Sequence, residues 1–344
     1  MSFLIPPPIE PMLARLQEQI PRGEGWLYEP KWDGFRAIVF RDGDNVHIGS
    51  RNTLPLARYF PDVVDVACRA LPDRCVVDGE IIIAGDSGLE FETLQLRLHP
   101  AASRVKMLAE QTPASFVAFD CLAAGSEDMR KRPFSERRRQ LVESIEFSTR
   151  CFATPQTENP DEATGWFDRF EGAGLDGVVA KRADGPYVPG ERVMVKVKHA
   201  RTADCVVGGY RKSKDGKGIG SLLLGLFDGG GVLHHVGHTS SFSAKEKREL
   251  AELLAPLEGE GSFVGGRMPG GPSRWSQGKD MAWVSLDPKL VCEVAFDHLQ
   301  GDRFRHATRF LRWRPDKRPS DCTFEQLDAP RPFDLQEIVR MGRR

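Results

Sequence analysis

A lysine beside a tight turn is the first candidate for chemistry in this sequence. Lys31 stands in the string K-W-D-G-F-R, between Pro30 and the turn-forming pair Asp33-Gly34, where a chain reversal could aim its amine at one point. An unprotonated lysine amine can attack phosphorus, and a nearby cation such as Arg36, or a metal, would favour that form. Taken alone, the string fits a surface lysine paired with Asp33 better.

Five further strings follow in a fixed order. Each has an ordinary structural interpretation, because Asp-Gly pairs make turns, a phenylalanine on a strand usually enters a core, and V-K-V-K fits an edge strand with solvated lysines. Alternatively, the lysines and Arg36 could neutralise a triphosphate. Six strings in one order arise by chance far more rarely than one does. The five are S-R-N from Ser50, D-G-E-I from Asp78, F-V-A-F-D-C-L from Phe116, D-G-V-V-A-K from Asp176 and V-K-V-K from Val195.

Together these strings resemble the motifs of the ATP-dependent DNA ligases, which share the covalent nucleotidyltransferase superfamily with RNA ligases and mRNA capping enzymes. A seventh string, R-F-L-R-W-R-P-D-K from Arg309 to Lys317, is similar to the C-terminal motif of the family. The resemblance spans about residues 11–317. It is strongest to the small bacterial LigC-type enzymes and to the ligase module of bacterial end-joining proteins.

The resemblance implies a role for each matching residue. Lys31 would become adenylylated by the ATP substrate, Glu29 would read the adenine edge and Phe119 would stack on the base. Glu80 and Asp176 would face Mg²⁺ or Mn²⁺. Because the family more often has glutamate at the position of Asp176, this shorter carboxylate could act through a water. The phosphates and ribose would be held by Arg36, Arg51 and Glu80, the α-phosphate by Lys196 and Lys198, and the leaving pyrophosphate by Arg314, Asp316 and Lys317.

The elements that must position these residues can be read from hydrophobic periodicity. Aromatic and β-branched residues alternate with polar ones on both sides of Asp42-Gly43-Asp44-Asn45, which predicts a hairpin over residues 26–52. In the first 198 residues the pattern predicts further strands at 75–84, 116–122, 177–181 and 192–198, and helices at 104–109 and 135–145. Beyond them it predicts strands at 204–210, 221–227, 232–238 and 290–297, a helix at 244–254 and a Gly/Pro-rich loop at 259–271.

The length and composition suit two folded domains. The 344 residues are 40% hydrophobic and 28% charged. We expect an α+β nucleotidyltransferase (adenylation) domain with antiparallel sheets over residues 1–198, a hinge at 199–203, an OB-fold β-barrel over 204–320 and a C-terminal tail at 321–344, of which the last dozen residues are loosely held. Seven cysteines without a C-x-x-C pair indicate reduced thiols. With no apolar run of about 20 residues and no signal peptide, we expect a cytoplasmic protein without a membrane span.

Nucleic-acid binding is indicated by local charge, since the net charge is only −1. Residues 303–317 contain six arginines or lysines interleaved with aromatic residues, and residues 130–139 contain six more. Such clusters can follow phosphates, although a solvated helix face is an equally good interpretation of 130–139. A third cluster comprises Arg211, Lys212, Lys214 and Lys217.

The implied function is ATP-dependent sealing of 5′-phosphorylated nicks in duplex DNA, within DNA repair. We expect a monomer that repair polymerases or end-binding proteins assist, because the length leaves no room for a DNA-encircling, polymerase or nuclease domain. An RNA ligase or a capping-type guanylyltransferase is an alternative with the same lysine chemistry. A noncatalytic DNA-end-binding protein is another, although the full set of Lys31, Glu80, Lys196 and Lys198 argues against it. An NAD-dependent ligase would need a cysteine-rich zinc module, which the sequence lacks.

The choice of nucleophile gives a first prediction. Lys31→Ala should abolish the covalent protein adduct that forms from ATP labelled at the α-phosphate, while the fold stays intact, because no other amine would be correctly placed. Gel electrophoresis under denaturing conditions measures the adduct, and circular dichroism checks the fold. An adduct at full yield on the variant would show that another residue is the nucleophile.

Overall fold

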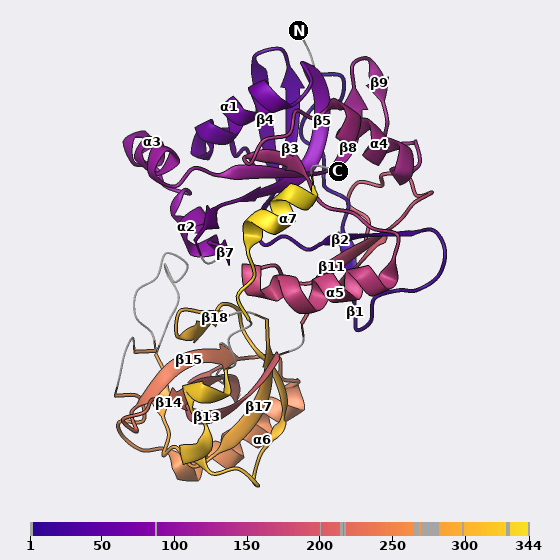
Figure 1. The fold of residues 1–344 in the computed structure, drawn as a ribbon. Coiled ribbons are helices and arrows are strands. Elements are labelled where there is room, and N and C mark those ends of the chain that lie inside the picture. Colours follow the sequence, from indigo (N-terminus) through magenta and orange to yellow (C-terminus); the bar gives the residue numbers. More distant parts are fainter. Residues whose placement is uncertain are drawn as a thin grey trace. The chain divides into compact units, whose positions relative to one another are not determined.

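The computed structural model describes residues 3–86, 88–199, 201–213, 216, 218–264, 268–269, 282–297, 299–327 and 331–342. The chain forms two compact units. Residues 1–198 and 330–344 make up the first, and residues 199–329 make up the second (Figure 1). Lys214, Lys217 and part of the loop predicted at 259–271 lie outside the described residues. No helix of the described chain is long and apolar enough to cross a membrane.

A four-stranded sheet of the first unit carries two of the motif strings. Its order is β1 (Ala14–Gln17), β12 (Met194–Val197), β11 (Val178–Arg182) and β2 (Trp26–Pro30). The interpretation of V-K-V-K as an edge strand is therefore wrong, because β12 lies between β1 and β11. Alternate residues point to opposite faces, so Val195 and Val197 pack with helix α5 (Pro160–Phe170) while Lys196 lines a cavity.

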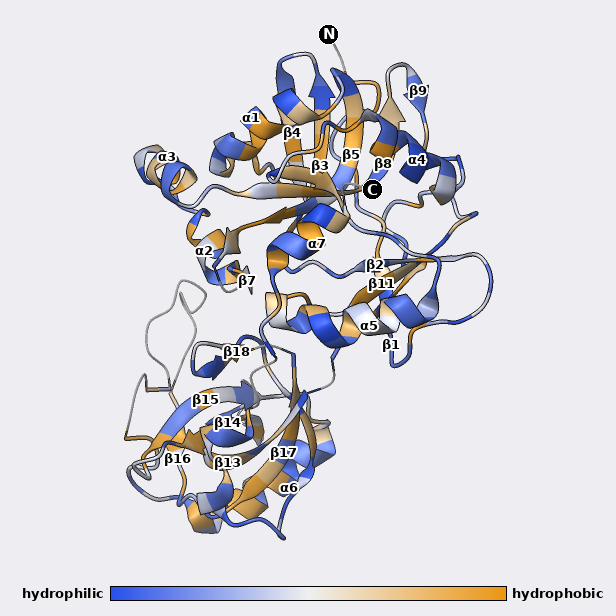
Figure 2. Cartoon of the chain, viewed as in Figure 1, coloured by the Kyte–Doolittle hydropathy of each residue, from blue (hydrophilic) through white to orange (hydrophobic). Residues whose placement is uncertain are grey.

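A second sheet of six strands carries the strings from Ser50, Asp78 and Phe116 and the end of the string that begins at Lys31. The hairpin of β3 (Phe35–Asp42) and β4 (Asn45–Ser50) confirms the predicted one, with Asp42 opposite Asn45. Helix α1 (Pro61–Ala70) packs on one face (Figure 2), and Glu80 and Phe119 line the cavity from β5 and β8. The remaining strands are β10 (Cys151–Ala153), β8 (Ser115–Ala124), β5 (Arg74–Ile82) and β9 (Glu127–Asp128).

Shorter elements complete the first unit. The helices predicted at 104–109 and 135–145 are confirmed as α3 (Ala102–Gln111) and α4 (Phe134–Ser144). Helix α2 (Phe91–Leu96) and the small pair β6 (Ala84–Gly85) and β7 (Gly88–Leu89) connect β5 to α3.

The second unit is the expected OB-type barrel. Its main sheet runs β15 (Leu233–Thr239), β14 (Ile219–Phe227), β13 (Arg201–Lys212), β17 (Val291–Phe296) and β20 (Arg309–Trp313). A bridge between Thr239 and Thr308, and a hydrogen bond of 3.1 Å from the Phe310 amide to Thr239 Oγ1, join the first strand to the last and close the sheet. The unit also contains β16 (Val284–Ser285), β18 (Leu299–Gln300), β19 (Arg303–Phe304) and the predicted helix α6 (Ala244–Leu254).

The prediction that the last dozen residues of the C-terminal tail are loosely held is wrong for the described part of that segment. Cys322 is buried in the barrel core, and residues 331–342 pack with the first unit. Helix α7 (Leu335–Met341) buries Leu335, Ile338 and Val339 there. These residues at i, i+3 and i+4 form an apolar stripe, but seven residues give too short a pattern to distinguish from an irregular tail.

Two glycines near α5 test how tightly the C-terminal segment packs. A Cβ at Gly172 would lie 1.7 Å from the Arg331 carbonyl oxygen, so Gly172→Ala must displace backbone and should destabilise the chain by about 2 kcal/mol or more. At Gly165, inside α5, the nearest atom to a Cβ is 3.7 Å away, so Gly165→Ala should stabilise by about 0.5–1 kcal/mol. Urea unfolding measures both. Equal effects of the two substitutions would contradict the packing of residue 331 against residue 172.

Candidate active site

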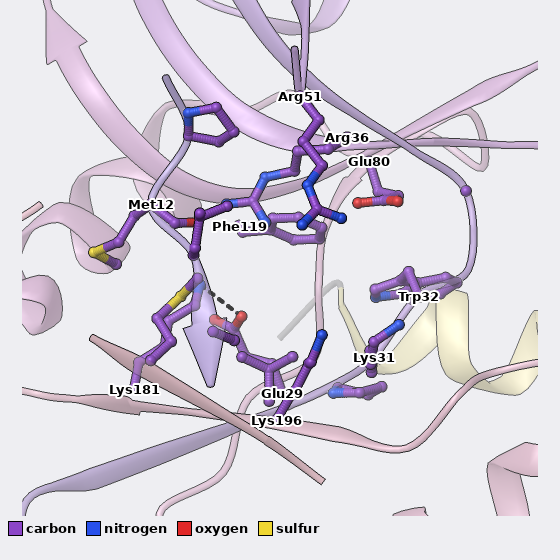
Figure 3. Close-up of a pocket in the computed structure, with 17 residues that line it drawn as sticks. Met12, Glu29, Lys31, Trp32, Arg36, Arg51, Glu80, Phe119, Lys181 and Lys196 are labelled. Atoms are coloured by element: carbon purple, nitrogen blue, oxygen red, sulfur yellow. Dashed lines mark hydrogen bonds and ion pairs between the residues drawn. The ribbon is translucent and has the colours of Figure 1, made fainter. Parts of the chain in front are cut away.

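A cavity of about 200 Å³ in the first unit collects most of the predicted site residues. Both sheets contribute to its walls, and the chain between β2 and β3 supplies Lys31 and Trp32 (Figure 3). Asp176 and Lys198 do not line the cavity, but Asp176 forms an ion pair with Lys31, and Lys198 forms one with Asp176. Predicted residues that line the cavity are Glu29, Lys31, Arg36, Arg51, Glu80, Phe119 and Lys196.

Lys31 is tied to Asp176 through both backbone and side chain. The Lys31 amide donates to the Gly177 carbonyl and the Asp176 amide donates to the Lys31 carbonyl, each at 2.9 Å. Lys31 Nζ lies 2.7 Å from Asp176 Oδ2, and Lys198 Nζ lies 2.6 Å from the same oxygen. Asp176 is therefore a buried carboxylate shared by two ammonium groups.

Glycines allow the chain to pass this closely. Gly177 has a φ of +123°, and a Cβ there would lie 2.0 Å from the Val197 carbonyl oxygen. A Cβ at Gly34 would lie 2.1 Å from the Ile81 carbonyl oxygen. The glycines of Asp33-Gly34 and Asp176-Gly177 thus allow two backbone segments to lie close together. Asp78-Gly79 is not a turn either, because both residues lie inside β5.

Glu29 is held by two donors that the sequence analysis missed. Lys181 Nζ lies 2.8 Å from Glu29 Oε2 (Figure 3), and Gln156 Nε2 donates to Glu29 Oε1 at 3.0 Å. Lys181 closes the string D-G-V-V-A-K and is two residues from Val179, so the period of a strand places both on the cavity face. That period was the available signal for Lys181. Gln156 lies outside every motif string, so no sequence signal pointed to it.

Arg36 is fixed by a buried carboxylate before any ligand arrives. Its Nε and Nη2 donate to the two oxygens of Asp78, each at 2.6 Å, and the Tyr187 hydroxyl donates to Asp78 Oδ2 at 2.7 Å. The guanidinium carbon lies 5.0 Å from the centroid of the Phe119 ring, and Lys181 Nζ lies 5.4 Å from it. Phe119 is therefore both part of an apolar cluster and a wall of the cavity.

Burial shifts the pKa values of two cavity residues, Glu80 and Lys196, towards their neutral forms. Burial raises the pKa of the Glu80 carboxyl to about 7, and the opposing attraction of Arg36 and Lys31 is weaker. Burial, together with repulsion from Lys198, Lys31 and Arg51, lowers the pKa of Lys196. Both pKa shifts indicate that charged side chains in this cavity are poorly hydrated.

The predicted metal ligands, Glu80 and Asp176, offer only part of a coordination sphere. Among the described residues no three acidic, histidine or cysteine side chains cluster so that they could hold an ion. Glu80 lines the cavity, and burial makes its carboxyl costly to ionise even with Arg36 and Lys31 nearby. This suits a hard cation that is bound by one carboxylate, waters and ligand phosphates. Asp176 is already engaged by two lysines.

The three residues of the C-terminal motif lie in the second unit and form ion pairs there. Arg314 Nη1 lies 2.8 Å from Asp204 Oδ1, and Lys317 Nζ lies 3.2 Å from Asp204 Oδ2. Arg314 also donates from Nε and Nη2 to the Asp316 carboxylate, whose pKa this hydrogen bonding lowers to about 2. Asp204 therefore neutralises both cations assigned to the leaving group.

The three basic clusters have different fates. Arg303 Nε donates to the His235 carbonyl at 3.1 Å, and burial together with Arg303 and Arg211 lowers the pKa of His235 to about 3, so one arginine of each of the clusters at 211–217 and 303–317 lies near His235. In the cluster at 130–139, Arg137 is fully buried in a bidentate pair with Asp120. A solvated face therefore describes only part of that cluster, because Arg137 anchors α4 on β8 while Lys131, Arg132 and Arg139 are exposed.

Comparison with known proteins identifies the family. The model for the ATP dependent DNA ligase domain matches residues 11–198, and the model for the ATP dependent DNA ligase C terminal region matches residues 215–317. The chain belongs to the ATP-dependent DNA ligases. Both matches are to DNA ligases, so they give no support to an RNA ligase or a capping-type guanylyltransferase.

Relatives extend the match along nearly the whole ligase chain. DNA ligase C1 of Mycolicibacterium smegmatis is 52% identical, with 98% of this chain and 99% of the relative covered. The end-joining DNA repair protein LigD of Mycobacterium tuberculosis is 30% identical over 87% of this chain but only 37% of its own length. A solved structure of a Lig E DNA ligase aligns with a TM-score of 0.56 at 20% identity, covering 89% and 99% of the two chains.

The raised pKa of Glu80 predicts a dependence of stability on pH. Between pH 4.5 and 7 the folded chain keeps a proton on Glu80 that the unfolded chain has lost, so the wild type loses stability relative to Glu80→Gln as the pH rises. The Gln variant should be more stable than wild type by about 1–3 kcal/mol at pH 8, and the difference should shrink towards pH 5. Urea unfolding at both pH values measures it, with exposed Glu110→Gln as the control. A pH-independent difference would contradict the burial of this carboxyl.

Proposed function

We propose that this ligase seals 5′-phosphorylated nicks in duplex DNA in three transfers, through AMP bound covalently to Lys31. The observation that carries the proposal is the position of Lys31 in the wall of a cavity that also presents Glu29, Arg36, Phe119 and Lys196. That set combines one nucleophile, a surface for a base, and cations for phosphates.

The first transfer consumes ATP. Lys31 Nζ leaves its ion pair with Asp176, gives up a proton to water and attacks the α-phosphorus. A nitrogen–phosphorus bond forms, and the bond from that phosphorus to the oxygen of pyrophosphate breaks. Asp176 keeps Lys198 as its partner when Lys31 has reacted, so no carboxylate is left buried and unpaired. Lys196 and Lys198 would stabilise the charge on the α-phosphate.

Base selection would depend on Glu29 and Phe119. A carboxylate has about four acceptor sites, and Glu29 uses two of them for Lys181 and Gln156. A remaining site can accept from the exocyclic amine of adenine, whereas guanine presents a carbonyl oxygen at that edge. Phe119, with cations on its flanks, offers the stacking surface.

A divalent cation, Mg²⁺ or Mn²⁺, would enter with the triphosphate and be held by Glu80. When bound it supplies charge neutralisation at the phosphates. The resemblance assigns Asp176 to the metal as well, but its two short lysine contacts favour a role as their counter-ion. Arg36 and Arg51 would hold the ribose and phosphate side from the opposite sheet.

The barrel would assist the leaving group and then the DNA. Arg314 and Lys317 would exchange Asp204 for pyrophosphate in the first transfer, with Asp316 orienting Arg314. That exchange needs movement at the hinge predicted at 199–203. Arg211 and Arg303 would then contact DNA phosphates while the nick 5′-phosphate takes AMP and the 3′-hydroxyl displaces it.

A role in repair is supported by the similarity to LigD, whose name assigns it to end joining. We propose that this ligase acts as a monomer in the bacterial cytosol or nucleoid, with a repair polymerase or an end-binding protein as its partner.

A label-transfer experiment tests the proposal. The protein is incubated with ATP labelled at the α-phosphate and a divalent metal, and unlabelled ATP and nicked DNA are then added. Label should appear first on the protein, then on the 5′ end of the nick, and finally as free AMP with sealed DNA. An intact nick with no protein-bound label at any time would refute the function.

The same assay tests whether Asp176 belongs to the active site. Asp176→Ala should lose most of its adduct, because Lys31 and Lys198 lose their shared counter-ion, whereas Asp176→Glu should retain adduct formation. Full adduct formation by the alanine variant would remove this residue from the site.

A further inference from the structure

The segment 331–342 lies outside the residues matched by either family model. Its helix α7 nevertheless buries Leu335, Ile338 and Val339 in the first unit, with exposures of 4%, 0% and 2%. Gln336, Glu337 and Arg340 remain exposed on the other side of the helix. The segment thus has one apolar face, and the first unit covers it.

The apolar cluster that receives α7 also forms the back wall of the ATP cavity. It contains Trp32 and Phe119, both of which line the cavity, together with Phe152, Trp166 and Phe170. Trp32 Nε1 donates to Thr154 Oγ1 at 2.8 Å, and the Trp32 ring meets Phe152 edge to face at 5.6 Å. Figure 3 draws α7, in pale yellow, behind Trp32 and Lys31.

Both ends of the segment are seated against backbone. At the first end, Gly172 lies so close to the Arg331 carbonyl oxygen that no Cβ would fit between them. At the other end, a Cβ at Gly342 would lie 2.1 Å from the Ala153 carbonyl oxygen. The Phe333 ring packs on Phe170 with 5.1 Å between centroids. These contacts fix both the position and the register of α7 against the strand that holds Phe152.

Trp32 and Phe119 depend on this packing to different extents. Phe119 stands on β8, which is hydrogen-bonded to β5 and β10 on its two edges. Residues 31–34 belong to no strand. The Lys31 backbone is held by its two hydrogen bonds to residues 176 and 177, and Trp32 is held by its hydrogen bond to Thr154 and by packing in the apolar cluster. Removing support behind Trp32 should therefore shift the nucleophile more than the stacking surface for the base.

We propose that α7 is a positioning element for Lys31, with Ile338 and Val339 as the positioning residues that hold Trp32 from behind. The inference rests on the proposed lysyl-AMP function. An attacking atom must approach phosphorus in line, and a displacement of about 1 Å can reduce the rate about 100-fold. The third transfer does not need Lys31 as a nucleophile, because AMP is by then on the DNA.

Single-turnover kinetics of Ile338→Ala in the full chain test the proposal. We expect the rate of adduct formation at saturating ATP to fall about tenfold or more, with the ATP concentration at half-maximal rate changed less than about threefold. Sealing of a nick that already carries 5′-linked AMP should stay within about twofold of wild type. Ile338→Val should restore most of the adduct rate. The matched control is Gln336→Ala, on the exposed side of α7, which should behave as wild type.

Each other outcome has a defined meaning. Wild-type adduct formation by Ile338→Ala would overturn the proposal. An equal loss in adduct formation and in sealing of the adenylylated nick would also overturn it, because α7 would then only support the fold. If Ile338→Ala does not fold, as judged by circular dichroism, Val339→Ala removes less volume and is judged by the same two rates. Absence of an adduct on the wild type would refute the proposed function instead.

Discussion

The active site depends on holding several cations in a poorly hydrated cavity before a nucleotide is present. Three carboxylates achieve this, and all are almost fully buried: Glu29, Asp78 and Asp176. Glu29 pairs with Lys181, and Asp78 pairs with Arg36. Asp176 pairs with both Lys31 and Lys198. A buried ion pair stabilises a fold little, but removal of one partner is costly, so each carboxylate makes the position of its cation obligatory. The phosphates of ATP therefore enter a field of charges that is already oriented.

The same requirement explains the repeated Asp-Gly pairs. In Asp78-Gly79 and Asp176-Gly177 the aspartate supplies a buried negative charge, and the glycine lets a neighbouring backbone approach within contact distance. A Cβ at Gly79 would lie 2.4 Å from the Val117 carbonyl oxygen. Close approach of backbones removes the space that water would occupy, and this keeps the ion pairs of the cavity strong. A turn, which is the usual interpretation of Asp-Gly, would need neither property.

The sequence predicted what periodicity and ordered strings can encode. Strands β2 to β5, β8, β11 to β15 and β17 followed from alternation and turns, and the residues that line the cavity followed from the family resemblance. Lys181 was missed because its role depends on a partner 152 positions earlier, and Gln156 belongs to no string. The cluster at 130–139 was misjudged because a basic run on a helix looks alike whether it faces water or, like Arg137, a buried carboxylate. Pair contacts of this kind come from the tertiary fold.

The C-terminal helix changes how the two units must be considered. Because residues 331–342 belong to the first unit, the barrel is an insertion, and the chain crosses between the units once at 198–199 and again between 327 and 331. A hinge at 199–203 is then only one of two connections, and any rotation of the barrel must be accommodated at both. Truncation after Ala200 would remove more than the barrel, since it would also uncover Trp166 and Phe170 behind the nucleophile. A deletion that isolates the role of the barrel must therefore keep α7, because the wall behind Lys31 is completed by the end of the chain.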